Sequence, residues 1–312
     1  MKRFSNVTTT QIARICGVSQ GTVDRALHNR SEIKEETKQK ILAVAKEYDY
    51  VPRVGEKATL KGKSMLIGVV LFDLYNEFFS KLAMSLVNQA KKAGYSVVFL
   101  FSNKDIKTEK SAIDYFNYIG VDGIVLFSVG SDDEGYATYL RSLMKPIVLI
   151  GNRIENLTYI GIDDYRAMYD LTIRQAGEQP EGEIAYFAPV LSQKLSQNNA
   201  QTLRAKGFVD AMISLKREYR IVVNTEALKG SAGIVCSTDY YALQALKKLG
   251  YAPKEKLAGF DNLSVLKTLR TKILTVEYST DRIAIECLKC VLGRKYKKEI
   301  EYRIVYNMDE DF

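Results

Sequence analysis

Residues 8–29 constrain the fold more than any other stretch, because they have the pattern of a helix-turn-helix. Gly17 suits a tight turn between two short helices, since glycine tolerates a left-handed backbone. Val18 is placed to fill the space between the helices, and Ser19 is placed to cap the second one. The predicted inward-facing positions are Ile12, Ala13, Ile15, Val23, Ala26 and Leu27. The chain is therefore predicted to begin with a small helical unit.

The second predicted helix has a polar face that a DNA major groove could accept. This face carries Gln20, Gly21, Asp24 and Arg25. In a major groove, arginine fits the acceptors of guanine and glutamine fits adenine, whereas Gly21 offers no side chain. An ordinary helical hairpin packed in a larger core is the alternative interpretation of the same pattern.

Positive charge is concentrated in the first fifth of the chain. Residues 1–63 hold 13 Lys and Arg residues against 7 Asp and Glu, while the whole chain of 312 residues has a formal net charge of +8. Neutralisation of phosphates supplies most of the sequence-independent affinity of a protein for DNA. A basic segment that coincides with a helix-turn-helix therefore favours the DNA-binding interpretation.

The run from Val7 to Pro52 resembles the N-terminal domain of the LacI/GalR family of transcription factors. The pattern that carries the resemblance is Cys16-Gly17-Val18-Ser19, Thr22 through Leu27, Glu36 through Ala45, and Tyr50-Val51-Pro52. The order of elements continues to agree over nearly the whole chain. The resemblance implies a homodimeric regulator, most simply a repressor, that binds a pseudo-palindromic double-stranded DNA operator under the control of a small molecule.

The resemblance also implies which residues contact DNA. Base contacts are expected from Gln20, Gly21 and Arg25, and phosphate contacts from Thr8, Ser19, Thr22 and Asn29. In the family, a hinge after this domain places a leucine in the minor groove. Here the hinge or linker spans 51–63, with Thr59 at the leucine position, Leu60 one residue later and Arg53 in place of an asparagine. Thr59 and Leu60 are the hinge residues expected on DNA.

From residue 64 onward, apolar runs typical of buried strands alternate with amphipathic helices. Strands are predicted at 65–71, 96–101, 123–127, 147–150, 184–189, 221–223, 233–237, 256–260 and 300–306. Such alternation indicates parallel sheets covered by helices on both faces. The predicted fold is thus an all-α helix-turn-helix headpiece (1–50) followed by an α/β core (64–312). The core is expected to have two lobes, 64–155 with 280–306, and 156–279.

This layout resembles the periplasmic-binding-protein-like core of the same family, in which a sugar or sugar derivative binds between two doubly wound parallel-sheet lobes. The effector-contacting residues that the resemblance implies are Asp73, Asn76, Phe79, Arg153, Asp163, Arg204, Asp239, Asp261 and Tyr278. Some of these have a structural alternative: Asp163 could serve only as a helix N-cap, and at least one of Phe78 and Phe79 is expected in the core. Tyr278 stands where the family often has glutamine, which predicts a more aromatic site.

Other classes of protein fit the sequence less well. A solute-binding protein would carry an export signal and lack the headpiece, whereas Met1-Lys2-Arg3-Phe4 is followed by polar residues. An enzyme would need a reactive constellation, yet the single histidine, His28, lies in the headpiece and no glycine-rich phosphate loop is present. We therefore expect no enzymatic activity, cofactor, metal or membrane association, and a cytoplasmic location.

Overall fold

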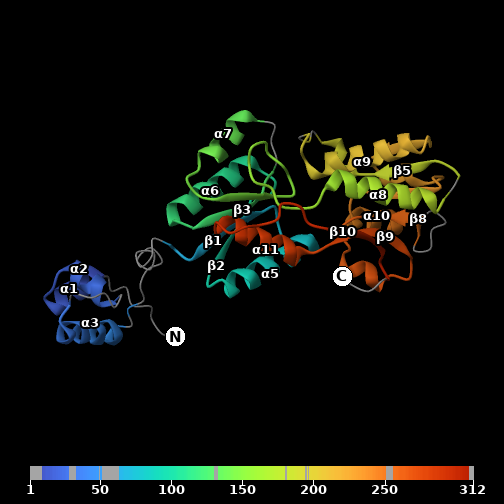
Figure 1. The fold of residues 1–312 in the computed structure, drawn as a ribbon. Coiled ribbons are helices and arrows are strands. Elements are labelled where there is room, and N and C mark those ends of the chain that lie inside the picture. Colours follow the sequence, from blue (N-terminus) through green and yellow to red (C-terminus); the bar gives the residue numbers. More distant parts are fainter. Residues whose placement is uncertain are drawn as a thin grey trace. The chain divides into compact units, whose positions relative to one another are not determined.

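The computed structural model describes residues 9–27, 33–48, 50, 63–129, 133–179, 181–193, 195, 197–250 and 256–308 (Figure 1). The chain divides into two compact units, Met1–Ser64 and Met65–Phe312. No helix among the described residues has the length and apolar character needed to span a membrane.

The N-terminal unit contains three helices, α1 (Thr9–Cys16), α2 (Gln20–Leu27) and α3 (Glu35–Glu47). The turn between α1 and α2 forms as predicted. Gly17 has a φ of +70°, and Ser19 Oγ accepts a hydrogen bond from the backbone N–H of Thr22 at 3.1 Å. The buried core of this unit consists of Ile12, Ala13, Cys16, Val23, Ala26, Ile41 and Ala45. Ile15, which we expected on the inward face, is 46% exposed. Ile12, Ala13 and Cys16 define the inward stripe, and Ile15 lies at its edge.

The first lobe of the core is built on a parallel sheet of four strands in the order β2-β1-β3-β4 (Figure 1). These strands are β1 (Leu66–Leu71), β2 (Ser96–Phe101), β3 (Gly123–Phe127) and β4 (Ile147–Ile150). Alternate strand residues face opposite helix layers. Helices α5 (Glu77–Lys92) and α11 (Thr280–Val291) cover one face, and α6 (Ile106–Ile119) and α7 (Glu134–Ser142) cover the other.

The second lobe is built on a sheet of six strands in the order β10-β9-β8-β7-β5-β6. The strands are β5 (Ile184–Phe187), β6 (Tyr219–Val222), β7 (Gly233–Cys236), β8 (Lys256–Ala258), β9 (Ile273–Tyr278) and β10 (Tyr302–Tyr306). Helices α8 (Asp164–Gly177) and α9 (Ala200–Ser214) pack on each other over one face, and α10 (Asp239–Leu249) covers the opposite face (Figure 1). A short 3-10 turn, Thr225–Leu228, connects β6 to β7. The predicted fold class, a helical headpiece and a two-lobed α/β core, is confirmed.

The end of the chain differs from our expectation in two respects. Strand β9 was not predicted, and β10 pairs antiparallel with β9 in the second sheet rather than joining the first lobe. Only α11 of this segment packs in the first lobe, against α5. The chain therefore passes between the lobes three times, after β4, after β9 and after α11.

Candidate functional sites

The polar face of α2 is arranged by short side-chain contacts. Gln20 and Gly21 are exposed, and Gln20 Nε2 donates to Thr9 Oγ1 at 3.1 Å. Arg25 Nε donates to the carbonyl oxygen of Gly21 at 3.2 Å, one turn earlier on the same helix. The hydroxyl groups of Ser19 and Thr22 are hydrogen-bonded to each other, with 2.8 Å between Oγ and Oγ1. Four of the nine predicted DNA-contacting residues, Thr8, Asn29, Thr59 and Leu60, lie outside the described residues.

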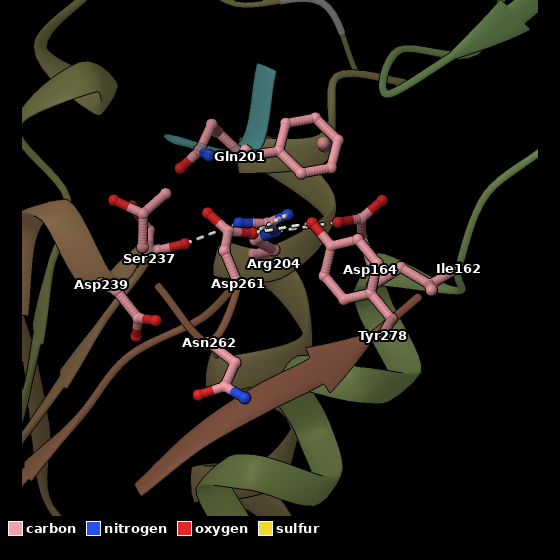
Figure 2. Close-up of polar contacts among 12 residues, drawn as sticks. Ile162, Asp164, Gln201, Arg204, Ser237, Asp239, Asp261, Asn262 and Tyr278 are labelled. Atoms are coloured by element: carbon pink, nitrogen blue, oxygen red, sulfur yellow. Dashed lines mark hydrogen bonds and ion pairs between the residues drawn. The ribbon is translucent and has the colours of Figure 1, made fainter. Parts of the chain in front are cut away.

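A charged cluster centred on Arg204 lies in the second lobe (Figure 2). Its side chain is 8% exposed, and Nε donates to Asp164 Oδ1 at 2.8 Å. Nη1 donates to the carbonyl oxygen of Ser237 at 2.8 Å, and Nη2 lies 3.6 Å from Asp261 Oδ1. The guanidinium plane also lies 3.5 Å from the ring centroid of Phe260. Arg204 is therefore fixed by its contacts with three segments of the lobe.

Close packing of two helices brings the first acidic partner to Arg204. A Cβ at Gly207 on α9 would lie 2.2 Å from the carbonyl oxygen of Tyr165, so only glycine permits this approach of α9 to α8. Asp163 Oδ1 accepts the backbone N–H of Arg166 and caps α8, as the structural alternative predicted. Asp164, the next residue, points to Arg204.

A strained turn after β8 presents the second acidic partner. Asp261 has a φ of +106° and Asn262 a φ of +46°, conformations that are uncommon for residues other than glycine. The backbone N–H of Asp261 donates to the carbonyl oxygen of Val276 at 3.0 Å, and that of Asn262 donates to Thr275 Oγ1 at 3.2 Å. Such strain persists only where the surrounding structure imposes it, and it is concentrated at functional sites.

Asp239 supports this turn from within the lobe. Its side chain is fully buried, Oδ2 accepts the backbone N–H of Leu263 at 2.9 Å, and Oδ1 accepts the hydroxyl of Thr275 at 2.8 Å. We had expected Asp239 to contact the effector directly. Its carboxylate instead faces protein donors, so its geometry is that of a positioning residue for Asp261.

Burial dominates the electrostatics of the cluster. It raises the pKa of Asp261 to about 6 and the pKa of Asp239 to about 7, and the neighbouring Asp261 charge adds to the shift at Asp239. Burial also raises the pKa of Asp164, although the Arg204 charge opposes that shift. Tyr278 donates its hydroxyl proton to Asp261 Oδ1 at 2.8 Å, and burial raises the pKa of this hydroxyl well above its usual value.

The predicted site residues of the first lobe do not all reach this cluster. Asp73 and Asn76 use their side-chain oxygens to accept the backbone N–H groups of Tyr75 and Phe78, both at 2.9 Å. Phe79 is buried in an aromatic cluster with three other phenylalanines, Phe72, Phe78 and Phe127.

Two features of the first lobe do approach the second. Phe78 has its ring centroid 5.9 Å from that of Tyr278. Arg153 Nη2 donates to the carbonyl oxygen of Ile162 at 3.3 Å, and its guanidinium lies 4.5 Å from the ring centroid of Tyr159. Of the phenylalanine pair considered from the sequence, Phe79 is thus the core residue, and Phe78 is the one that faces the second lobe.

Known protein families match both units of the chain. Residues 8–53 match bacterial regulatory proteins of the lacI family, and residues 64–232 match the periplasmic binding proteins and sugar binding domain of the LacI family. The second match alone spans more than half of the 312 residues. The chain belongs to the lacI family.

Relatives of this lacI-family protein are named regulators. The HTH-type transcriptional regulator RegA of Clostridium saccharobutylicum is 26% identical, over 96% of each chain. The ribose operon repressor of Bacillus subtilis is 22% identical and covers 92% of this chain and 91% of its own length.

The solved structures that resemble the protein show the same fold. A LacI-family regulator from Silicibacter pomeroyi has a TM-score of 0.76 at 20% identity, and it covers 96% of this chain and 98% of its own. The lac repressor dimer bound to operator and an anti-inducer has a TM-score of 0.74 at 18% identity, with 96% and 97% covered.

Sequence reasoning missed several residues of the lacI-family protein that the structure brings to the cluster or between the lobes. They are Asp164, Gln201, Ser237, Phe78 and Glu77. The doubled aspartate at 163–164 was a usable signal, since only one of two adjacent aspartates can cap the helix. Gln201 lies one turn before Arg204 on α9, a spacing that places both on one helix face.

Proposed function

We propose that this lacI-family regulator is a homodimeric, sequence-specific DNA-binding repressor whose affinity for its operator is set by a sugar or sugar derivative bound at the Arg204 cluster. One observation carries the proposal: a single chain combines a helix-turn-helix with an α/β core that encloses a hydrogen-bonded guanidinium and two carboxylates. The names of the relatives, which include a ribose operon repressor, support a regulator that answers to a sugar.

The DNA-binding surface is assigned to α2. Gln20 and Arg25 have the donor groups that read base edges, and Ser19 and Thr22 lie at the helix N-terminus, where hydroxyl and backbone N–H groups suit phosphates. Among the residues that the structure describes, Arg25 makes one hydrogen bond, which is exposed and goes to the backbone carbonyl of Gly21. It can therefore exchange that contact for a guanine without leaving a buried group unpaired.

The effector is assigned to the cluster because of its chemistry. Carboxylates accept hydrogen bonds and a guanidinium donates them. Two neighbouring hydroxyl groups of a sugar can donate to the carboxylates and accept from the guanidinium at the same time. Arg204, Asp164 and Asp261 are held by protein contacts before any ligand arrives, so little ordering is needed on binding. Asp239 holds the Asp261 turn rather than the ligand.

Control of DNA binding requires that the effector prefer one arrangement of the lobes. The backbone N–H of Ser264 in the second lobe donates to both carboxylate oxygens of Glu77 in the first, at 2.9 and 3.0 Å. This contact and the Phe78–Tyr278 pair depend on the separation of the lobes. A ligand that favours their closed arrangement supplies the coupling, which is typically about 1–3 kcal/mol.

An enzymatic role receives no support from the relatives, which are transcriptional regulators. The proposed role places the protein where operator DNA is, in the cytoplasm. It also calls for a dimer, because a pseudo-palindromic operator presents two equivalent half-sites.

Selection of DNA from a random pool by the full-length protein at fixed salt tests the operator proposal. We expect enrichment of a two-fold-symmetric site, and we expect Arg25→Ala to relax the preference at one base pair in each half-site, at a cost of about 1–3 kcal/mol. Lys40→Ala is the matched control, because its ammonium group contacts the carbonyl oxygen of Cys16 and lies outside α2. Salt-sensitive binding without any enriched sequence would contradict the proposal.

A further inference from the structure

We propose that the effector carries a protonated amine in addition to hydroxyl groups, and that the site rejects ligands with phosphate or carboxylate groups. The inference rests on the proposed function of the Arg204 cluster and specifies the chemical class of its ligand. It follows from three properties of the site: its charge, the commitment of its donors and the acceptors that remain unused.

Carboxylates outnumber cations around the site. Arg204, Asp164 and Asp261 have side chains 8%, 3% and 6% exposed, so one guanidinium faces two enclosed carboxylates. Charges that act on this trio from neighbouring residues include those of Arg153 and Asp163. Three carboxylates thus accompany two guanidinium groups, and solvent screens the inner pairs weakly because they are enclosed.

The guanidinium nitrogens of Arg204 are already engaged by protein oxygens, and those of Arg153 are engaged in part. Each of the three nitrogens of Arg204 contacts an oxygen, from Asp164, Ser237 or Asp261, and one face of the group lies on Phe260. Arg153 lies against Tyr159, and its Nη2 donates to a carbonyl oxygen, although its buried Nε has no partner among the described residues. An anionic ligand would compete with two carboxylates for Arg204 and would be repelled by them, and any carboxylate that it displaced would be left unpaired, which is strongly unfavourable.

Acceptors, in contrast, remain available. Within the described residues, the hydrogen bonds and ion pair of Asp164 and Asp261 engage Oδ1 of each carboxylate and leave Oδ2 as an acceptor. Gln201 Oε1 and Ser237 Oγ are enclosed and lack a hydrogen-bond partner within the part of the chain that the structure describes. The hydroxyl hydrogen of Tyr278 is used in the hydrogen bond to Asp261, so the Tyr278 oxygen is left to accept a hydrogen bond from a ligand.

A site of this composition favours a ligand that donates hydrogen bonds and brings positive charge. Hydroxyl groups supply donors but no charge, whereas an ammonium group supplies three donors and compensates one of the excess carboxylates.

Isothermal titration calorimetry of the full-length protein at about pH 7 tests the inference. The ligands are D-glucose, D-galactose, D-mannose and D-ribose, each as the neutral sugar, the amino sugar and the sugar phosphate, with the uronic acids of the hexoses. We expect one scaffold to bind as its amino sugar about tenfold or more tightly than as the neutral sugar, since one added ion pair of this kind is worth about a factor of ten. We expect its phosphate and uronate to bind more weakly than the neutral form.

Two variants connect the preference to the carboxylates. Asp261→Asn removes the charge beside Arg204, and Asp163→Asn removes a peripheral charge while retaining an N-cap oxygen for α8. We expect both to reduce the ratio of amino-sugar to neutral-sugar affinity, Asp261→Asn by more, and Asp163→Asn serves if Asp261→Asn does not fold.

The outcomes separate this inference from the proposed function. Tighter binding of a phosphate or uronate than of the matching amino sugar would overturn the inference and leave a sugar-binding site. An unchanged affinity ratio in both variants would also overturn it. Failure of every sugar in all series to bind, by a protein that still binds its selected operator, would overturn the assignment of the effector site itself.

Discussion

The two lobes each bury carboxylates, but they treat them differently. In the first lobe, fully buried Glu109 accepts hydrogen bonds from the hydroxyl of Tyr136, from Ser128 Oγ at 2.9 Å and from the backbone N–H of Val129 at 2.7 Å. Both of its oxygens are engaged. In the second lobe, Asp164 and Asp261 share Arg204 and use only Oδ1 in their hydrogen bonds and ion pair.

The comparison shows that burial of a charge does not by itself mark a binding site. Glu109 has no charged partner within the described part of the chain, yet both of its oxygens accept hydrogen bonds, and Asp239 in the second lobe is likewise enclosed by donors. The Arg204 cluster differs because acceptors remain after all internal contacts are made. Unused hydrogen-bonding capacity, rather than a raised pKa, distinguishes a candidate site from a structural network.

Removal of the central cation should have the largest effect. Arg204→Met leaves Asp164 and Asp261 buried without a partner, and we expect it to lower the free energy of unfolding by about 3–5 kcal/mol, measured by urea denaturation. Arg166→Met is the matched control, since Arg166 is exposed and pairs with Asp170, and we expect a change below about 1 kcal/mol. Equal losses in the two variants would contradict the buried-charge account.

The pH dependence of stability should identify the carboxylate concerned. The folded state raises the pKa of Asp261 from 3.8 to about 6, so it retains a proton that the unfolded chain releases. The contribution of Asp261 is fully present below about pH 4 and is lost as the pH rises to about 6. As the pH rises across that range, the free energy of unfolding of Asp261→Asn should therefore increase by about 2–3 kcal/mol relative to that of wild type. A difference that stays constant with pH would contradict this assignment.

Neutralisation of the first-lobe carboxylate should affect stability alone. Glu109→Gln turns an amide N–H₂ toward groups that donate, and we expect a loss of about 1–3 kcal/mol in the free energy of unfolding. Effector affinity, measured by calorimetry, should not change, because Glu109 lies in the first lobe between α6, α7 and β3. A loss of effector affinity in Glu109→Gln would contradict the view that the buried carboxylate of the first lobe is purely structural.

The smallest effect is expected at the contact between the lobes. Glu77→Gln replaces a carboxylate that accepts from the backbone N–H of Ser264, and we expect effector affinity to fall by about twofold to fivefold, or up to about 1 kcal/mol. Lys81→Met, which removes only the ion pair with Glu77, is the control and should change affinity less. If the control matches the Glu77 variant, the ion pair rather than the bond across the lobes is responsible.

The sequence predicted local features well. Gly17, the Ser19 cap and the Val23–Ala26 stripe depend on residues close in the chain, and all three form as expected. The two-lobed core followed from repeated strand and helix patterns. Ile15 was placed wrongly because a short helix with three apolar positions leaves its inward direction ambiguous until α3 packs on it.

Long-range relations were not predictable in the same way. The antiparallel pairing of β10 with β9 joins segments more than twenty residues apart with no turn signal between them. The doubled aspartate at 163–164 suggested that one carboxylate was not needed as a cap. It did not indicate that this carboxylate would meet Arg204, because that contact depends on the approach of α9 to α8. Asp239 was assigned to the ligand from its position after a strand, but the Asp261 turn folds over its carboxylate.

The most direct test of the account measures operator affinity, by fluorescence anisotropy on the selected site, with and without the effector. Wild type should show a change of about fivefold or more. Arg204→Lys keeps the positive charge but loses the planar fork that contacts Asp164, Ser237 and Asp261 together. We predict that this variant binds the operator like wild type and does not respond to the effector. A full response by Arg204→Lys would contradict the assignment of this cluster as the control site.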